Sequence, residues 1–467
     1  MRYGGFVNKT HDASISIINS NGDIEFASGS ERYTKRKHES ILDKELVSKL
    51  LEVDCRVYFQ DYDIDFMADM SYDHHKSHAA SSFYTRPWDS WKDTVMLSID
   101  GTGKDTYTSN NIYVYDKENN DFINLYSDLK SIGSVYTAIT KHIGFHSLEA
   151  GITMGLSSFG TPIYTNNVLE LMQEDWHTFF KNQITNMEYY KDLFKRYDSL
   201  SKFVDTNSET WKEDLAASVQ EAAEIRILEY AKMARKYGSK LCYAGGVAQN
   251  IIANSKIRDL FDDMWIVSDP TDGGGSLGAS AWAYTSDYGG THINWIDAYL
   301  GHDIQKEVNP KEVVDYILKH KVCGIANGKA EFGPRALGNR SLIGDVRYDI
   351  KDTVNRIKKR QNFRPFGPVI LEEEFDKWFE GHTNGYMQYV CKPKHDLQSV
   401  IHVDGTSRVQ TVPSHSRSII RPILEEYYER TGVPMLLNTS LNIKGEAMVN
   451  SEHDAKQFES KYNVKVF

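Results

Sequence analysis

Two successive segments of the chain share one layout, an apolar strand followed by a glycine-rich turn and a helix. The first is SKLCYAGGVAQNIIANSKIRDLF, with Gly245 and Gly246 at the turn, and the second is MWIVSDPTDGGGSLGASAWAYT, with Asp272 before three glycines. Strands that alternate with helices in this way predict an α/β fold. Glycines at such turns let backbone N–H groups approach an anionic ligand, although many α/β folds use them for packing alone.

Other segments fit the same fold class. The alternating run Ser14–Ile18, the turn signal at Asn21 and Gly22 and the following IEFAS predict a β-hairpin. The apolar run TVMLSID predicts a buried strand with Asp100 at its C-terminal end, where side chains of α/β sheets project into clefts. Residues 134–145 and 214–238 have the apolar period of amphipathic helices.

The length of the chain, 467 residues, exceeds one typical core and predicts two or more domains. The segment GHDIQKEVNP, residues 301–310, is polar and has no apolar period, so we expect an interdomain linker there. A helix, KEVVDYILKH, and a strand, VCGIAN, follow it. We therefore predict one domain over residues 1–303 and a second over residues 304–467.

Bulk composition excludes several classes of protein. The formal net charge of −11 argues against long nucleic-acid ligands, whose non-specific binding requires neutralisation of many phosphates. No apolar run is long enough to span a bilayer and the N-terminus has no apolar signal segment, so a cytoplasmic protein without membrane contact is expected. The four cysteines form no CxxC pair, which indicates neither a disulfide framework nor a thiolate zinc site.

The stretch YDHHKSHAASSFY contains three histidines in five residues. His74 and His78 are four residues apart, so on a helix they share one face and can direct both imidazoles at one point. This is a metal-ligand geometry, but an isolated HxxxH also arises by chance.

Seven blocks, in this order along nearly the whole chain, resemble the O-carbamoyltransferases of the NodU/CmcH type: TKRKHES, DHHKSHAASSFY, AGGVAQN, EFGPRALGNRS, FRPFGP, HVDGTSRVQTV and LLNTSLNIKGEAMV. The resemblance implies an N-terminal domain of the actin/Hsp70/sugar-kinase type, similar to the tRNA threonylcarbamoyl transferase subunit, and a C-terminal YrdC-like α/β domain. It also implies a reaction in two steps. The C-terminal domain makes carbamoyladenylate from ATP, with its Mg²⁺, and carbamoyl phosphate, and the N-terminal domain transfers the carbamoyl group to an acceptor hydroxyl.

The resemblance further implies a divalent metal, Fe²⁺ first with Mn²⁺ and Zn²⁺ as alternatives, held by His74, His78, Asp100 and Asp272. Two imidazoles and two carboxylates suit such a cation with an open position. Taken singly, Asp100 could instead cap the turn that follows it, and Asp272 could be an ordinary turn acid. His75 is expected to be structural or to support the ligands.

His11 and Asp12, in the HDAS segment that the family shares, are the predicted catalytic residues, because an alcohol attacks an activated carbonyl well only while a base removes its proton. The alternative is a capped turn before a strand. For Lys35, Lys37 and His38 of TKRKHES a solvated charged surface is the better expectation.

The nucleotide and carbamoyl site combines basic groups for the phosphates with glycines and polar groups. Its predicted members are Gly245, Gly246, Asn250, Lys329, Arg335, Arg340, Lys358, Arg364, Asn438, Thr439 and Ser440. The alternative is that some of these arginines pair with acids such as Glu331 or Asp345. Lys329 stands where the family commonly has arginine, and Ile152 stands where it commonly has lysine.

Two other functions stay open. An actin/sugar-kinase-type phosphotransferase would use the glycine turns for ATP phosphates but leaves the RALGNRS region unexplained. A catalytically silent nucleotide-binding protein would not need the metal ligands. The acceptor is undetermined: a sugar, an antibiotic, a nucleoside or a nucleotide all fit. The aromatic segment around residues 174–202 could stack on a base or sugar ring of the acceptor, although aromatic residues at helical spacing more often belong to a core or an interface. A homodimer is left open.

Overall fold

The structure is a computed structural model that describes residues 1–59, 67–102, 108–173, 200 and 202–467. By its contacts the chain divides into two compact units, unit 1 with residues 1–55 and 294–467 and unit 2 with residues 56–293. This division by contacts differs from the division by function at residues 303/304, which stays a prediction. The aromatic segment around residues 174–202 lies almost wholly outside the described residues.

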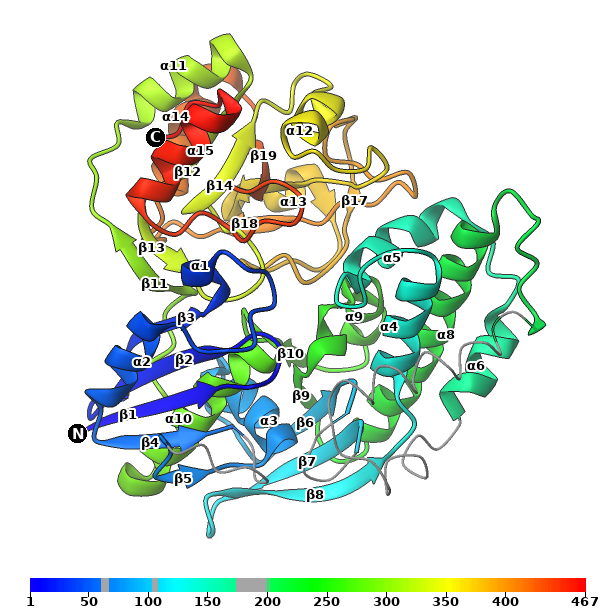
Figure 1. Cartoon of the computed structure of the whole chain (residues 1–467), viewed down its shortest axis with the longest axis vertical. Coiled ribbons are helices and arrows are strands. Elements are labelled where there is room, and N and C mark those ends of the chain that lie inside the picture. Colours follow the sequence, from blue (N-terminus) through cyan, green and yellow to red (C-terminus); the bar gives the residue numbers. More distant parts are fainter. Residues whose placement is uncertain (60–66, 103–107, 174–199, 201) are drawn as a thin grey trace. The chain divides into compact units, whose positions relative to one another are not determined.

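The elements of unit 1 come from both ends of the chain (Figure 1). They are β1 (Arg2–Val7), β2 (Ser14–Asn19), β3 (Ile24–Gly29), α1 (Glu31–Thr34), α2 (Lys44–Leu51), β11 (Tyr299–Ile304), α11 (Pro310–His320), β12 (Val322–Ala326), β13 (Gly328–Glu331), β14 (Arg340–Gly344), α12 (Lys351–Ile357), β15 (Gly367–Leu371), η5 (Glu372–Glu374), α13 (Phe375–Trp378), β16 (Phe379–Glu380), β17 (Lys392–Pro393), β18 (Gln410–Val412), α14 (Ile420–Thr431), β19 (Met435–Ser440) and α15 (Glu452–Tyr462).

The predicted N-terminal hairpin is confirmed, because β2 pairs antiparallel with β3 and also with β1. Gly22 at its turn has φ +83°, a conformation that favours glycine. The expected linker is wrong for its first four residues: residues 301–304 belong to β11, which pairs antiparallel with β13. Backbone pairing holds this strand even though His302 and Asp303 interrupt its apolar pattern.

A five-stranded sheet in the order β12-β14-β19-β15-β18 forms the centre of unit 1. Neighbouring residues of its strands point to opposite faces, as in β14, where Leu342 packs with α12, α13 and α15 and Ile343 packs with α11 and α14. Both faces are therefore covered by helices. Pairing of β14, β19, β15 and β18 brings the parts of the chain near residues 340, 440, 367 and 410 together. This pairing positions the basic residues described below.

Unit 2 contains the elements between them. They are β4 (Cys55–Tyr58), whose first residue precedes the boundary, β5 (Met70–Ser71), α3 (His74–Thr85), β6 (Thr94–Ile99), β7 (Asn110–Asp116), β8 (Asp121–Asp128), α4 (Ile132–His142), α5 (Ala150–Leu156), η1 (Ser157–Phe159), α6 (Thr165–Gln173), α8 (Trp211–Ala234), β9 (Lys240–Ala244), η4 (Gly246–Gln249), α9 (Ile251–Arg258), β10 (Asp263–Trp265) and α10 (Asp272–Tyr288).

The sheet of unit 2 has the strand order β10-β9-β6-β7-β8. Strands β10, β9 and β6 are parallel, so their carboxyl ends meet at one edge, and β7 and β8 extend the sheet antiparallel. Helix α3 packs on β6 and β9, and α10 packs on α3. Helix α8 packs on β6, and α4 and α9 pack on α8. The predicted α/β fold is confirmed, and the shared edge of β6 and β9 positions Asp100.

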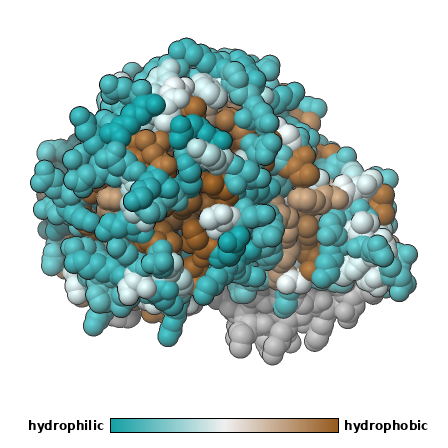
Figure 2. All heavy atoms as spheres, turned by 90° about the horizontal axis from the view of Figure 1, so that it is seen from above, coloured by the Kyte–Doolittle hydropathy of each residue, from teal (hydrophilic) through white to brown (hydrophobic). Residues whose placement is uncertain are grey.

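Hydrophilic residues cover much of the face in Figure 2, and hydrophobic residues are visible between them. Among the described residues, the most exposed large aliphatic side chains include Ile163 and Ile296, which lie in different units. None of the described helices combines the length and the apolar character needed to cross a membrane.

Candidate active site

Helix α3 carries two of the four predicted metal ligands. It begins at His74, and the carboxylate of Asp73 caps it by accepting the N–H of Lys76 at 2.7 Å. The four-residue spacing puts His74 and His78 on one face, and both imidazoles are buried, with 4% and 0% of their surface exposed. His75 points elsewhere: its ring nitrogens lie 3.2 Å from Ser98 Oγ and 2.7 Å from the Thr108 carbonyl oxygen.

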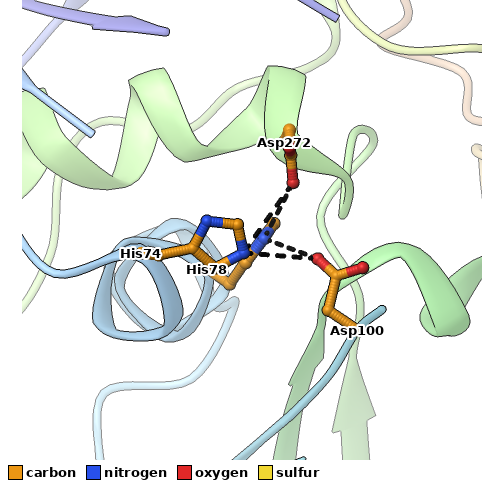
Figure 3. A group of neighbouring side chains, drawn as sticks. All are labelled: His74, His78, Asp100 and Asp272. Atoms are coloured by element: carbon orange, nitrogen blue, oxygen red, sulfur yellow. Dashed lines mark ion pairs between the residues drawn. The ribbon is translucent and has the colours of Figure 1, made fainter. Parts of the chain in front are cut away.

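Asp100 and Asp272 reach the same point from other elements, as Figure 3 shows. Asp100 follows β6, and its Oδ2 lies 3.0 Å from His78 Nε2 and 3.6 Å from His74 Nε2. Asp272 is the first residue of α10, and its Oδ1 lies 3.4 Å and 3.9 Å from the same two nitrogens. One ligand atom from each of the four residues lies within 4.8 Å of the other three.

The glycines beside Asp272 make this approach possible. A Cβ on Gly278 of α10 would lie 1.9 Å from the Ser77 carbonyl oxygen of α3, and a Cβ on Gly275 would lie 2.0 Å from the ring of Phe59. Neither position can hold a larger residue without separating the packed elements. The DGGGSLG run therefore has a packing reason, which is to let α10 lie close to α3.

The glycine turn at Gly245 and Gly246 has a packing reason as well. A Cβ on Gly245, which has φ +92°, would lie 2.2 Å from the Ile99 carbonyl oxygen, and a Cβ on Gly246 would lie 3.0 Å from Asp100 Oδ1. Asn250 caps α9 through the Ala253 N–H and exchanges hydrogen bonds with the buried amide of Gln220. Contact of these three residues with a nucleotide stays a prediction.

Interactions within this group shift the pKa of His74, His78 and Asp100. Burial lowers the pKa of His78, but the carboxylates of Asp100 and Asp272 outweigh it and raise that pKa to about 9. Burial raises the pKa of the Asp100 carboxyl, but the two imidazoles outweigh it and hold that pKa well below its usual value. Asp100 also accepts the Gly101 N–H through Oδ1 at 2.7 Å, so it caps its turn and still presents Oδ2 to the histidines.

This donor set fits a divalent transition metal. Two imidazole nitrogens and two carboxylate oxygens are suitable ligands for Fe²⁺, Mn²⁺ or Zn²⁺, and four protein ligands leave a position open where the ion is five- or six-coordinate. The sequence could predict the histidine pair from its spacing. The contribution of the two distant aspartates followed from the family resemblance alone.

In unit 1, a carboxylate links two histidines. Asp12 Oδ2 lies 2.9 Å from His11 Nδ1, and its Oδ1 lies 2.9 Å from His38 Nδ1. Burial raises the pKa of the Asp12 carboxyl, but the hydrogen bonds with both imidazoles outweigh it and hold that pKa well below its usual value. The predicted pair His11 and Asp12 therefore has a third member, His38, although the charged run TKRKHES around it predicts a solvated surface.

Unit 1 also contains a cluster of basic side chains close enough to shift one another's pKa. Burial and Arg364 lower the pKa of Arg335, and burial together with Arg335, Arg360 and Arg364 lowers the pKa of Arg408. In the part of the chain that the structure describes, neither the Arg335 nor the Arg408 guanidinium has a hydrogen-bond or ion-pair partner. Cations gathered in this way without acids favour an anionic ligand.

Two members of this cluster, Arg360 and Arg408, were missed by the sequence analysis. Arg360 donates to Asn355 Oδ1 at 2.7 Å and to the Pro365 carbonyl oxygen at 3.1 Å, and its guanidinium stacks on Phe366 at 4.1 Å from the ring centre. The signal was present, because Arg360 lies in the basic run NRIKKRQNFRPF and Arg408 lies in the block HVDGTSRVQTV. Arg360 stands close to Arg364 in the sequence, and only the folded chain brings this pair beside Arg335 and Arg408.

Lys358 is directed at the end of β19. Its ammonium donates to the Ser440 carbonyl oxygen and to the carbonyl and side-chain oxygens of Asn442, at 2.9 and 3.0 Å. Burial and the nearby Arg360 and Arg364 hold its pKa well below the usual value. Thr439 lies in β19 beside Asn438, and Lys329 lies in β13. Ligand contacts for these residues stay predictions.

Arg340 has a different environment from the one that we expected. Its side chain is fully buried, and it donates to the carbonyl oxygens of five residues at 2.8–3.1 Å, namely His302, Asn327, Gly328, Asn339 and Asn450. By donating to these carbonyl oxygens, the Arg340 guanidinium joins separate segments of unit 1. The contacts of Arg340 therefore indicate a structural role better than contact with an anion.

A single carboxylate shapes the loop that carries Arg335. Glu331 Oε1 accepts the backbone N–H groups of Leu337, Asn339 and Arg340 at 2.7–3.1 Å. Glu331 is thus used by backbone donors rather than by an arginine side chain. Three charge-assisted hydrogen bonds hold the loop in one conformation and fix where Arg335 and the carbonyls after it lie.

Comparison with protein-family models identifies both halves of the chain. The model described as Carbamoyltransferase N-terminus matches residues 41–281, and the model described as Carbamoyltransferase C-terminus matches residues 314–467. The chain belongs to the carbamoyltransferase family. This chain and the nodulation protein NolO of Bradyrhizobium diazoefficiens are 29% identical over 423 residues, 82% of this chain and 75% of that protein.

Other relatives extend the comparison. A nodulation protein U of Sinorhizobium fredii is 34% identical to this chain over 229 residues, 45% of this chain and 41% of that protein. The uncharacterized protein MJ1051 of Methanocaldococcus jannaschii is 28% identical over 524 aligned residues, 95% of this chain and 94% of that protein. The enzyme class expected from the sequence is confirmed by these matches.

Solved structures resemble parts of this chain with low TM-scores. The activator of 2-hydroxyisocaproyl-CoA dehydratase from Clostridium difficile, with bound ADPNP, covers 62% of this chain and 96% of its own, with 15% identity and a TM-score of 0.36. Full-length HypF in a phosphate- and nucleotide-bound form covers 61% of this chain and 55% of its own, with 15% identity and a TM-score of 0.34. At these scores the likeness carries no functional argument.

Proposed function

We propose that the protein is an ATP-dependent O-carbamoyltransferase. It converts carbamoyl phosphate, water and ATP to carbamoyladenylate with release of inorganic phosphate and pyrophosphate, and then passes the carbamoyl group to an acceptor hydroxyl with release of AMP. The observation that carries this proposal is the cluster of Arg335, Arg360, Arg364 and Arg408, in which two guanidinium groups have no partner among the described residues. ATP and carbamoyl phosphate supply the anions that such a cluster needs.

In the adenylation step, the planar guanidinium groups bind and orient the phosphates. Arg335 and Arg408 have donors available, so they are the first candidates for direct contact with phosphate oxygens. Arg360 is fixed by Asn355, Pro365 and Phe366, which positions its charge beside Arg364. The carboxylate of Glu331 holds the loop of Arg335 in place, so the cations are arranged before the substrates bind.

In the transfer step, His11 is the general base. Its Nδ1 lies 2.9 Å from the carboxylate of Asp12, which the pKa shift keeps ionised, so the proton on the ring resides at Nδ1. Nε2 is then the nitrogen that can accept the proton of the acceptor hydroxyl. His38 holds the other carboxylate oxygen of Asp12 and so positions the pair.

His74, His78, Asp100 and Asp272 would hold the divalent metal, with iron as the first expectation. Such an ion supplies Lewis-acid polarisation of a carbonyl or phosphoryl oxygen when it is bound. The residues themselves provide a buried, preformed ligand set on two closely packed helices and a strand end.

The test is to incubate the purified protein with ATP and carbamoyl phosphate and to measure carbamoyladenylate by mass spectrometry together with pyrophosphate release. We expect both products from the wild-type protein and from the matched control Lys319→Ala, an exposed lysine of α11, and neither from Arg335→Ala. Formation of ADP with a phosphorylated acceptor, without carbamoyladenylate, would establish a phosphotransferase instead. A panel of sugars, antibiotics, nucleosides and nucleotides, searched for the mass of one added carbamoyl group, identifies the acceptor.

A further inference from the structure

Unit 1 contains a cavity of about 390 Å³ beside the ends of α13 and β14. Its walls come from residues 346–349, which follow β14, from residues 396–398, from Trp378 at the end of α13 and from Val433 before β19. The volume lies within the range of sites that hold small molecules. None of these residues belongs to the basic cluster, to the metal ligands or to the group around Asp12.

This cavity and the basic cluster lie at opposite edges of the five-stranded sheet. Strand β14 begins at Arg340 and ends just before Val346, whereas the antiparallel β19 begins just after Val433 and ends at Ser440, whose carbonyl oxygen accepts from Lys358. Five strand residues separate the two edges by about 17 Å. A ligand of the cavity is therefore a different molecule from the anions that the basic cluster attracts.

A buried serine fixes two walls of the cavity to each other. Ser399, only 1% exposed, donates to the Tyr348 carbonyl oxygen at 2.6 Å and accepts the Ile350 N–H at 2.8 Å. Asp349 lies between the two residues that Ser399 binds, and Asp396 precedes Ser399 by three residues. The two acids thus line one cavity from loops that are joined before any ligand binds, which lowers the entropic cost of binding.

The basic side chains at the cavity are already paired with an acid. Arg347 donates to both carboxylate oxygens of Asp345, at 3.0 and 2.8 Å, and Lys321 Nζ lies 3.7 Å from the same carboxylate. In the described part of the chain, the exposed carboxylates of Asp349 and Asp396 have no ion-pair partner. The cavity therefore carries an excess of negative charge, which repels phosphates and attracts a cation.

Two aromatic rings add a preference for an organic cation. Trp378 is half-buried and packs against the core of the unit, and Tyr348 is 49% exposed. Lys321 Nζ lies 3.7 Å from the centre of the Tyr348 ring, so this ring already attracts one ammonium group. Aromatic rings bind ammonium groups through their π faces and pack on the apolar side of a ring-shaped ligand. A metal ion would instead require several more oxygen ligands than two carboxylates supply.

We propose that this cavity binds a small organic amine in its protonated form, with the size and chemistry of an amino sugar. The carboxylates of Asp349 and Asp396 bind the ammonium group, and the Trp378 indole packs against the ring of the ligand. A neutral sugar lacks the charge that the acids attract, and a sugar phosphate is repelled by them. This inference does not rest on the proposed function, because it involves neither the basic cluster nor the metal ligands.

The experiment titrates the full chain with glucosamine and with glucose, which differ only in the amino group, and measures binding by ligand-observed NMR at neutral pH. We expect glucosamine to bind about threefold or more tightly than glucose at low salt, which is the effect of two exposed ion pairs. High salt should reduce this preference, because it screens exposed charges. Equal affinities for the two sugars, or no binding of glucosamine, would overturn the inference.

The double variant Asp349→Asn, Asp396→Asn removes both charges and keeps the shape of the cavity. Both residues are exposed, so the variant should fold, and its affinity for glucosamine should fall to within about twofold of that for glucose. The matched control is Glu312→Gln, an exposed acid of α11 in the same unit, which should keep the wild-type preference. A preference for glucosamine that persists in the double variant would place its binding elsewhere and overturn the inference.

Discussion

Gly278 of α10 lies against Ser77 of α3 so closely that a Cβ at residue 278 would be 1.9 Å from the Ser77 carbonyl oxygen. Real Cβ atoms do not approach a carbonyl oxygen to that distance, so the absence of a side chain is what lets the two helices touch. This contact determines how near Asp272, at the start of α10, comes to the two histidines of α3.

We predict that Gly278→Ala separates α10 from α3. The free energy of unfolding should fall by about 1–3 kcal/mol, the usual effect of overpacking, and affinity for a divalent metal should fall as well because Asp272 moves away from His74 and His78. Urea unfolding and metal titration measure the two effects. The control is Gly151→Ala in α5, where an added Cβ meets nothing within 4 Å and stability should be unchanged or slightly higher. Equal stability of the two variants would contradict this account of the packing.

A second prediction concerns binding of the metal itself. Fe²⁺ or Mn²⁺ at about 100 times its dissociation constant should stabilise the wild-type protein by about 2.7 kcal/mol, and a chelator should reverse the effect. Asp272→Asn should abolish this response and the transfer to an acceptor, while formation of carbamoyladenylate continues. Asp287→Asn, in the last turn of the same helix, is the control and should respond as the wild type does. A metal-dependent stabilisation that survives in Asp272→Asn would exclude this residue as a ligand.

The metal ligands illustrate what the sequence can and cannot predict. His74 and His78 followed from a spacing, because the α-helical repeat alone places residues four apart on one face. Asp100 and Asp272 lie far away in the sequence, and no periodicity links them to the histidines. Their arrival at one point depends on parallel pairing of β6 with β9 and on the glycine contacts of α10, which only a folded chain displays.

The basic residues show that the sequence is equally limited in predicting what each residue does. Arg335 and Arg340 stand in one block and look equivalent as sequence, yet one guanidinium has no partner in the described residues and the other is bound by five carbonyl groups. Those carbonyls come from segments that are up to 148 residues apart, at His302 and Asn450. Charge and position in a motif identify a basic residue, but its hydrogen-bond partners decide whether it binds a ligand.

Truncation of Arg340 should therefore mainly reduce stability, whereas truncation of Arg408 should mainly reduce affinity for carbamoyl phosphate. Arg340→Ala should lower the free energy of unfolding by about 3 kcal/mol or more, because buried carbonyls lose their donors. Arg408→Ala should change stability by no more than about 1 kcal/mol, since loss of this side chain also removes repulsion with Arg335, but should weaken binding of carbamoyl phosphate at least about tenfold. Urea unfolding and calorimetry on both variants measure these effects. A stable Arg340→Ala protein with reduced affinity would return Arg340 to the ligand site.

The final prediction concerns the two imidazoles that share Asp12. His11→Ala should slow transfer to the acceptor by about 10²–10⁴-fold, the usual contribution of a positioned general base, while formation of carbamoyladenylate is unchanged. His38→Gln should slow transfer by roughly 10–100-fold, because it weakens one hydrogen bond to a charged group and leaves the base in place. Asp12 stays ionised across neutral pH, since its pKa is held well below the usual value, so loss of transfer through its protonation should begin only in strong acid. That loss should begin at a higher pH in His38→Gln, which weakens one of the hydrogen bonds that lower this pKa. A wild-type rate and pH profile in His38→Gln would show that the third member of the group is only a neighbour.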